Sequence, residues 1–195
     1  MPMEVRWVMT AELTYPGSRL APVMRPLSRF FLRQVEKVYG FFAMPAMPSD
    51  PTDPAGVLDD PRQVRWRSAT VRRVVEYARS PGPSAVLALA PEGRDIAVDT
   101  LGWPPPGGGR FIQQLARLGL SLFPVGVYEQ DAALTVRFGL PFTLVGAAGL
   151  SSAEIDRQVS LQVMGEIGRL LPERFCTRLP EEEYERLYHR AGSKG

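Results

Sequence analysis

The spacing of hydrophobic positions changes from one segment of the chain to the next, and it predicts strands and helices in alternation. Residues Glu4–Met9 fit a short strand, and Ser84–Ala90 is a continuous apolar run of the kind found in strands buried on both faces of a parallel sheet. Leu122–Tyr128 is a further apolar strand. In Leu134–Phe138 apolar residues alternate with polar ones, which predicts a half-exposed strand.

Helical spacing of apolar residues predicts helices over Pro26–Tyr39, about Ser68–Arg79 and about Arg110–Leu118. Ser151 and Glu154 have the spacing of a capping box, which opens a fourth helix that Pro172 stops. The predicted inward stripes are Val71, Val74, Val75 and Ala78 in the second of these helices, and Ile155, Val159, Val163, Ile167 and Leu170 in the fourth.

The alternation of strands and helices predicts an α/β fold with a mainly parallel central sheet flanked by helices. We expect residues 1–172 to form this domain and residues 173–195 to form a C-terminal helical tail. No apolar segment approaches the roughly 20 residues needed to cross a bilayer. We therefore expect a cytoplasmic protein, either free or peripheral on the inner face of the membrane.

Composition narrows the chemistry available to the chain. Its 195 residues are 45% hydrophobic and 23% charged, and the net charge of +2 gives no argument for a nucleic-acid partner, so we expect none. A single cysteine, Cys176, excludes an internal disulfide framework and a Cys-rich zinc module. A single histidine, His189, excludes Ser–His–Asp triads and histidine metal sites. We expect neither a metal nor a cofactor.

The strongest local candidate for a site is the segment Pro91-Glu92-Gly93-Arg94, directly after the apolar strand. In open α/β sheets, ligands bind beyond the carboxyl ends of the strands. Arg94 offers a planar fork for a phosphate or a carboxylate, and Glu92 could orient that fork or accept a hydrogen bond from a hydroxyl. The alternative is a tight turn with a surface ion pair.

Two further features each allow a functional and a structural interpretation. The glycine run Gly107–Gly109 before a helix could present backbone N–H groups to an anion, or could be a flexible surface loop. A basic row on the first predicted helix could face anionic lipid or a phosphorylated substrate, or could be an ordinary solvated face. These membrane-surface candidates are Arg25, Arg29, Arg33 and Lys37.

Three segments in sequence order resemble the glycerophospholipid acyltransferase superfamily, of the lysophosphatidate (1-acylglycerol-3-phosphate) acyltransferase type. They are APEGRD at Ala90–Asp95, LGWPPPGGGRFIQQLARLGLSLFPVGVYE at Leu101–Glu129 and LTVRFGLPF at Leu134–Phe142. The resemblance extends from Val5 to about Pro172. It implies an acyltransferase-like α/β fold and a parent reaction of phospholipid biosynthesis. In that reaction a fatty acyl group passes from acyl-CoA or acyl carrier protein to the hydroxyl of a lysophospholipid or related acceptor.

The resemblance also implies roles for particular residues. The first segment matches the family's P-E-G block, which implies that Pro91, Glu92, Gly93 and Arg94 bind the phosphate of the acceptor. The FPVGV strand matches a later block that helps to form the acyl pocket, which assigns Pro124 and Gly126 to that pocket.

The chain departs from the family at its catalytic motif, a His followed by four residues and an Asp, in which the His is the general base. His189 lies at the wrong end of the chain for this motif, so we predict no catalytic residue and little or no acyltransferase activity in the chain as written. Two explanations stay open. A preceding segment that carries the motif is missing, or the protein is a pseudoenzyme that binds lipid phosphate or a membrane surface without catalysis. Other departures favour divergence: Pro45-Ala46-Met47 where the family usually has an Arg, glycine in place of a basic residue at Gly107-Gly108, and Arg94 directly after Gly93.

Overall fold

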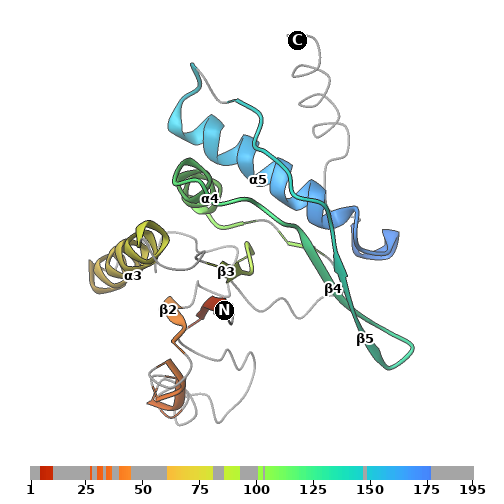
Figure 1. Cartoon of the computed structure of the whole chain (residues 1–195), viewed down its shortest axis with the longest axis horizontal. Helices are drawn as coiled ribbons and strands as arrows, with labels where there is room; N and C mark the ends of the chain where they lie inside the picture. Colours follow the sequence, from red (N-terminus) through yellow and green to blue (C-terminus); the bar gives the residue numbers. More distant parts are fainter. Residues whose placement is uncertain are drawn as a thin grey trace. The chain divides into compact units, whose positions relative to one another are not determined.

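A computed structural model provides the structure of the protein (Figure 1). It describes residues 5–10, 27, 30–32, 34–36, 40–44, 61–80, 86–92, 101–102, 104–146 and 149–176. The chain divides into two compact units, Met1–Asp95 and Ile96–Gly195. Helices and strands are both present, and three strands form a parallel sheet, so the predicted α/β class is confirmed.

The first unit contains the parallel sheet, in the strand order β2-β1-β3. Strand β1 (Val5–Thr10) lies in the middle and pairs with β2 (Phe42–Met44) on one side and with β3 (Val86–Leu89) on the other. The predicted first strand is thus confirmed. Strand β3 is only half-buried, which corrects the prediction of a strand buried on both faces. Among the described strands β3 has one neighbour, β1, and so lies at an edge of the sheet.

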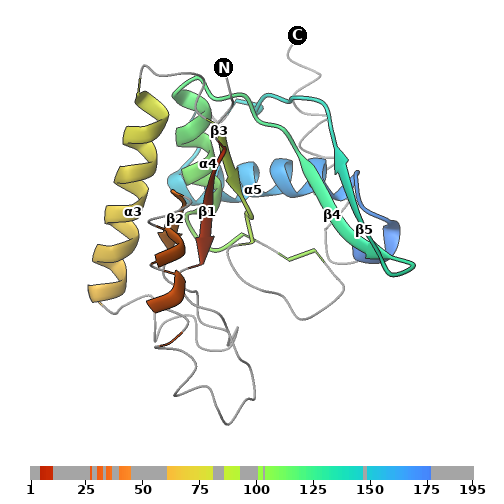
Figure 2. The ribbon, with the colours of Figure 1, turned by 60° about the horizontal axis from the view of Figure 1, so that its bottom comes forward.

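Helix α3 (Pro61–Arg79) runs alongside this sheet and contacts β2 (Figure 2). It begins about seven residues before the predicted start at Ser68, with a proline in its first turn, where the missing N–H has no partner to lose. Its buried stripe centres on Thr70 and Val74, while Val71 and Val75 are half-buried. The prediction therefore placed the buried face of the helix too far toward its apolar residues and missed the buried threonine.

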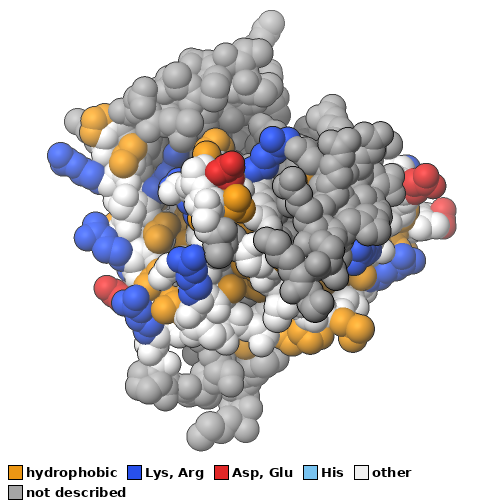
Figure 3. Space-filling view, turned by 90° about the horizontal axis from the view of Figure 1, so that it is seen from above, with side chains coloured by type: hydrophobic (Ala, Val, Ile, Leu, Met, Phe, Trp, Pro, Cys, Tyr) orange, Lys and Arg blue, Asp and Glu red, His pale blue; other side chains and the backbone are white. Residues whose placement is uncertain are grey.

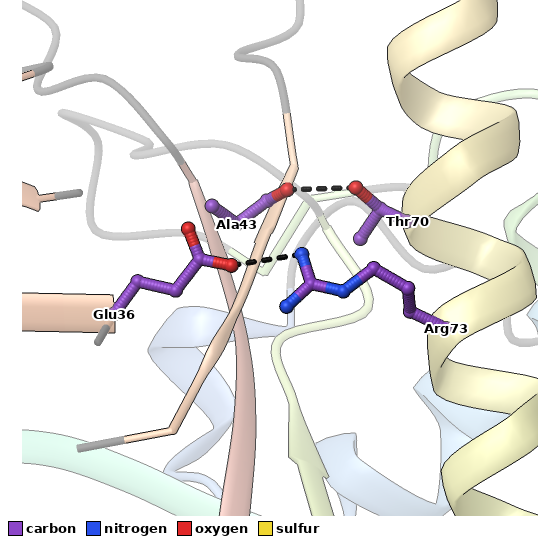
Figure 4. Close-up of polar contacts among 4 residues, drawn as sticks. All are labelled: Glu36, Ala43, Thr70 and Arg73. Atoms are coloured by element: carbon purple, nitrogen blue, oxygen red, sulfur yellow. Dashed lines mark hydrogen bonds and ion pairs between the residues drawn. The ribbon is translucent and has the colours of Figure 1, made fainter. Parts of the chain in front are cut away.

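Polar contacts hold α3 to the segments it covers (Figure 4). The Thr70 hydroxyl donates to the carbonyl oxygen of Ala43 at 2.9 Å, and both residues are buried. The Arg73 guanidinium pairs with the Glu36 carboxylate at 2.9 Å, an exposed contact of small energetic value. In the same unit, Leu32, Phe41 and Ala43 form a buried cluster with Val35 and Trp66 packed against it. The described residues between 27 and 36 are helical, in agreement with the helix predicted over Pro26–Tyr39.

The second unit is organised around two helices, α4 (Gly108–Arg117) and α5 (Ser152–Gly168). Helix α4 buries Gly109, Ile112 and Leu115. A Cβ on Gly109 would lie against the backbone oxygen of Asp156 and 2.8 Å from the Ser160 hydroxyl, so the two helices touch backbone to backbone at this glycine. Such close approach is possible only where one helix has no side chain.

The capping box predicted at the start of α5 is confirmed. The Ser151 hydroxyl accepts from the Glu154 N–H at 3.3 Å, and the Glu154 carboxylate accepts from the Ser151 N–H at 2.8 Å. Of the predicted inward residues, Val159 and Val163 are buried, whereas Ile155, Ile167 and Leu170 are only half-buried. The middle of the helix is buried on several sides, through Ser160, Leu161, Gln162 and Met164 as well.

Strands β4 (Val125–Gln130) and β5 (Ala133–Phe138) form an antiparallel hairpin, the long two-stranded ribbon of Figure 2. Its two-residue turn places Asp131 at φ 53° and Ala132 at φ 59°, the geometry of a type I′ turn. One face packs on the segment after α5, through Gly126 against Leu170 and through Tyr128, whose ring centroid lies 6.0 Å from that of Phe175. The hairpin adds an antiparallel pair to a fold that was predicted as mainly parallel.

The alternation in β5 correctly predicted a strand, but its apolar side chains do not face the core. Leu134 and Phe138 are 73% and 78% exposed, whereas the inward positions carry Thr135 and Arg137. Beyond α5, Glu173–Phe175 form a single 3₁₀ turn, and residues 177–195 of the predicted tail lie outside the described residues. In the described part of the chain, no helix is both long and apolar enough to span a bilayer.

Candidate functional site

The segment Pro91–Arg94 begins at the carboxyl end of β3. Pro91 and Glu92 form a turn two residues after Leu89, and both are half-buried. Glu92 also takes part in an interaction with another part of the protein. Gly93 and Arg94, predicted to complete this site, lie outside the described residues.

Strand register aligns this turn with the end of the neighbouring strand. Val8 of β1 stands opposite Leu89 of β3, and the strands are parallel. This is the last pair between the two strands: β1 continues for two residues to Thr10, and the chain turns at Pro91, two residues after Leu89. The carboxyl ends of β1 and β3 therefore lie next to each other, and β3 is on the opposite side of β1 from β2.

Pro124 and Gly126, the predicted acyl-pocket residues, are both buried in the second unit. A Cβ on Gly126 would lie 2.8 Å from the Cβ of Leu170 and 3.2 Å from a methyl group of Leu171. Pro124 packs against Gly139 across the hairpin, where a Cβ would lie 2.7 Å from its ring. The space beside both residues is thus filled by side chains of the same unit, and their role at an acyl chain stays a prediction.

The glycine run leads into the N-terminus of α4, and a carboxylate of the chain itself occupies that end. Asp156 of α5 accepts hydrogen bonds from the N–H of Gly107 at 2.7 Å and of Arg110 at 2.9 Å. Gly107 adopts φ 92°, a conformation that favours glycine, and has no side chain with which to cap the helix. An external anion would have to displace Asp156. The glycine run therefore has a structural role, in the contact between α4 and α5.

Asp156 is the residue that the sequence pattern did not reveal. A helix that opens with three glycines lacks a local acceptor for its free N–H groups, which is a signal that the acceptor comes from elsewhere. The pattern gives no indication of which of the acidic residues supplies it, because Asp156 lies 49 and 46 positions away from the two donors.

Two side chains with buried polar atoms were also missed. The Gln162 amide oxygen accepts from the Val145 N–H at 2.8 Å, while its Nε2 atom has no partner among the described residues. The Arg67 guanidinium likewise has buried Nε and Nη2 atoms without an acceptor there, and burial lowers the pKa of this arginine. Each is costly in isolation, and nothing in the periodicity of the chain marks it.

The remaining candidates fall largely outside the described part of the chain. All four residues of the basic row lie there, as does His189: Arg25, Arg29, Arg33 and Lys37. The Cys176 thiol is half-buried and donates to the carbonyl oxygen of Gly168 at 3.3 Å. Across the ranges that are described, no three His, Cys, Asp or Glu side chains gather as metal ligands would.

Comparison of the chain with protein-family models, with curated proteins and with solved structures finds no match.

Proposed function

We propose that the turn after β3 binds the phosphate of a lysophospholipid, in an acyltransferase-like α/β fold whose parent reaction is fatty-acyl transfer to that lipid. The acyl donor is acyl-CoA or acyl carrier protein, and the protein works in the cytoplasm at the inner face of the membrane. The resemblance of Ala90–Asp95 and of the segments after it to glycerophospholipid acyltransferases motivates the proposal.

The main structural support for this proposal is the order of the strands in the sheet. Strand β1 lies between β2 and β3, so the order of the sheet changes direction at β1. In open α/β sheets, ligands bind at the carboxyl ends of the strands where the order changes in this way. The Pro91–Glu92 turn follows the carboxyl end of β3, the strand that pairs with β1 on the side away from β2.

The residues of the turn suit an anionic acceptor. Arg94 presents a planar guanidinium that can hold two phosphate oxygens at once. The half-buried Glu92 carboxylate accepts hydrogen bonds, which suits it to orient Arg94 or to receive the acceptor hydroxyl. Pro91 fixes φ near −65° at the start of the turn, and a glycine such as Gly93 can adopt backbone conformations that other residues avoid.

Acyl transfer needs a base for the acceptor hydroxyl, because a neutral hydroxyl is a poor nucleophile. The only histidine, His189, does not stand in the His-x4-Asp motif. We therefore expect this chain to bind the acceptor and to transfer little or no acyl group by itself. Pro124 and Gly126 keep their proposed part in shaping an acyl site within the second unit.

The test is isothermal titration with a short-chain lysophosphatidate that stays monomeric in solution. Arg94→Ala is expected to weaken binding at least about tenfold, because a hydrogen bond to a charged group contributes about 1.5–3 kcal/mol. Arg72→Ala is the matched control, since it removes the same charge from an exposed position of α3 in the same unit, and it should leave the affinity unchanged. Equal losses in the two variants would show nonspecific attraction to positive charge and contradict the proposal.

An acyl-transfer assay accompanies the titration. Lysophosphatidate binding without transfer fits the chain as proposed. Transfer that is abolished by Glu92→Ala in a folded variant would show that the chain works without the family's base. Absence of lysophosphatidate binding, with vesicle binding that is lost at high salt and in an Arg29→Ala/Arg33→Ala variant, would replace the proposal with a membrane-surface protein.

A further inference from the structure

The β4–β5 hairpin exposes an apolar face that the described residues of its own unit leave uncovered. Inward positions pack on the segment after α5, so the alternate positions point outward. Seven outward side chains between 36% and 85% exposed make up what we term the hairpin outer face: Phe123, Val125, Val127, Leu134, Val136, Phe138 and Leu140. Figure 3 shows apolar side chains, in orange, reaching the surface of the described part of the chain.

Hydrogen-bond register makes this face a dense stripe. The Gly139 N–H donates to the Pro124 carbonyl oxygen at 2.9 Å, so the next pair along, Val125 and Phe138, is a pair without hydrogen bonds. By alternation the same holds for Val127 with Val136. In such pairs the Cα atoms are only about 4.5 Å apart and the side chains are closest. The outer face is therefore a continuous apolar ribbon two side chains wide.

The size of the face exceeds what a lone protein usually exposes. At roughly 150–200 Å² for a fully exposed residue of this kind, the exposed fractions correspond to about 700 Å². The largest apolar patch of a typical monomer is about 300–600 Å², whereas a stable interface of standard size buries about 800 Å² on each partner. The hairpin outer face is thus of the size that one half of a dimer needs.

Charge on the face argues against an anionic membrane as its occupant. Among the outward positions of the two strands, the charged residue is Glu129, opposite Leu134 near the turn. Lipid-binding surfaces carry Lys or Arg around their apolar residues, and an acidic side chain would be repelled by anionic headgroups. Arg137 lies on the inward side, with its guanidinium 5.2 Å from the Tyr128 ring centroid.

We propose that the hairpin outer face binds the same face of a second copy of this chain, in a two-fold symmetric dimer. An apolar face without complementary charge is matched by an identical apolar face, and two-fold dimers use the same patch on both subunits. The two-fold axis lies between the two hairpins at the Val127–Val136 pair and runs perpendicular to the strands. It places the turn of one hairpin over the open end of the other. Glu129 lies two residues from that pair, so at about 3.4 Å per residue the two carboxylates stay about 14 Å apart.

Light scattering of the full chain from 5 to 100 µM tests this interface, with wild type expected at twice 21.6 kDa. Val136→Glu sets two carboxylates near the axis and is expected to raise the dimer dissociation constant about 100-fold or more. Val64→Glu is the matched control, because Val64 on α3 is 45% exposed against 46% for Val136, and it should leave the dimer intact. An equimolar mixture of Val136→Glu and Val136→Lys chains is expected to restore the dimer.

A wild type that stays monomeric at 100 µM would overturn the proposal, and so would a folded Val136→Glu chain that dimerises like wild type. Monomers that bind neutral phosphatidylcholine vesicles through this face would replace the second copy with lipid. Thermal unfolding reports whether Val136→Glu folds. If it does not, Phe138→Lys makes the same test, since Phe138 is 78% exposed and gives up little contact within the monomer.

Discussion

Replacing Gly109 with alanine should separate the two helices of the second unit. The added Cβ would lie against the backbone oxygen of Asp156 and 2.8 Å from the Ser160 hydroxyl. A backbone atom in the middle of a helix cannot rotate away as a side chain can. The strain must therefore be relieved by moving α4 away from α5, which stretches the hydrogen bonds that Asp156 accepts from Gly107 at 2.7 Å and Arg110 at 2.9 Å.

The free energy of unfolding should fall by about 2–4 kcal/mol. Overpacking of a close contact costs about 1–3 kcal/mol, and weakening two hydrogen bonds to a carboxylate adds about 1–2 kcal/mol. Alanine is favoured over glycine by up to about 1 kcal/mol in a helix interior, but Gly109 lies in the first turn, where the gain is smaller. For a unit of this size, 2 kcal/mol lowers Tm by about 8–16 °C.

Thermal unfolding followed by far-ultraviolet circular dichroism measures this loss. Gly146→Ala is the control, since nothing lies within 4 Å of a Cβ built on Gly146, and its stability should stay within about 0.5 kcal/mol of wild type. A Gly109→Ala chain as stable as wild type, or a Gly146→Ala chain that loses as much, would refute the close helix contact.

Two further predictions concern local geometry in the second unit. Hydrogen bonds from Ser151, first from its side chain and then from its backbone, hold the pKa of the Glu154 carboxyl below its usual range of about 4.3. The ionised Glu154 carboxylate therefore contributes its full stabilisation above about pH 4.3, and this stabilisation is lost as the pH falls through the lower pKa of the folded state. When unfolding is measured from pH 7 to pH 3, Glu154→Gln should abolish this loss. Ala132 has φ 59° in the hairpin turn, where glycine carries no steric penalty, so Ala132→Gly should raise the free energy of unfolding by about 0.5–1 kcal/mol in urea titrations. A loss of stability in Ala132→Gly would contradict the turn geometry.

Elements governed by local sequence could be predicted. The capping box of Ser151 and Glu154 depends on residues three positions apart, and it is present as expected. The strand at Val5–Thr10 and its parallel pairing also agree with the alternation of strands and helices. The capping box and the strand itself depend on a few neighbouring residues, whereas the pairing of β1 with β2 and β3 joins segments more than 30 residues apart.

Features that depend on distant partners could not be predicted. A period of two shows that Leu134, Val136 and Phe138 share a face, but it does not show which face meets the core. Gly126 and Gly139 decide that, because their lack of side chains admits Leu170 on the opposite face. Asp156 reaches α4 from a helix more than 40 residues away, a contact that exists only once both helices have packed.

The candidate site likewise has one feature that the sequence predicts and one that depends on distant parts of the chain. That Pro91 and Glu92 follow a strand was evident from the apolar run before them, and the structure places them at the carboxyl end of β3. That β1 ends beside them depends on the strand order, which the linear pattern leaves open.

The most direct test of the account compares wild-type binding of two lipids with the same short acyl chain, lysophosphatidate and monoacylglycerol, by isothermal titration. The proposed site predicts saturable binding of lysophosphatidate at least about tenfold tighter than that of monoacylglycerol, because only the former offers a phosphate to the turn after β3. Equal affinities, or no binding of either lipid, would contradict a phosphate site at Pro91–Arg94.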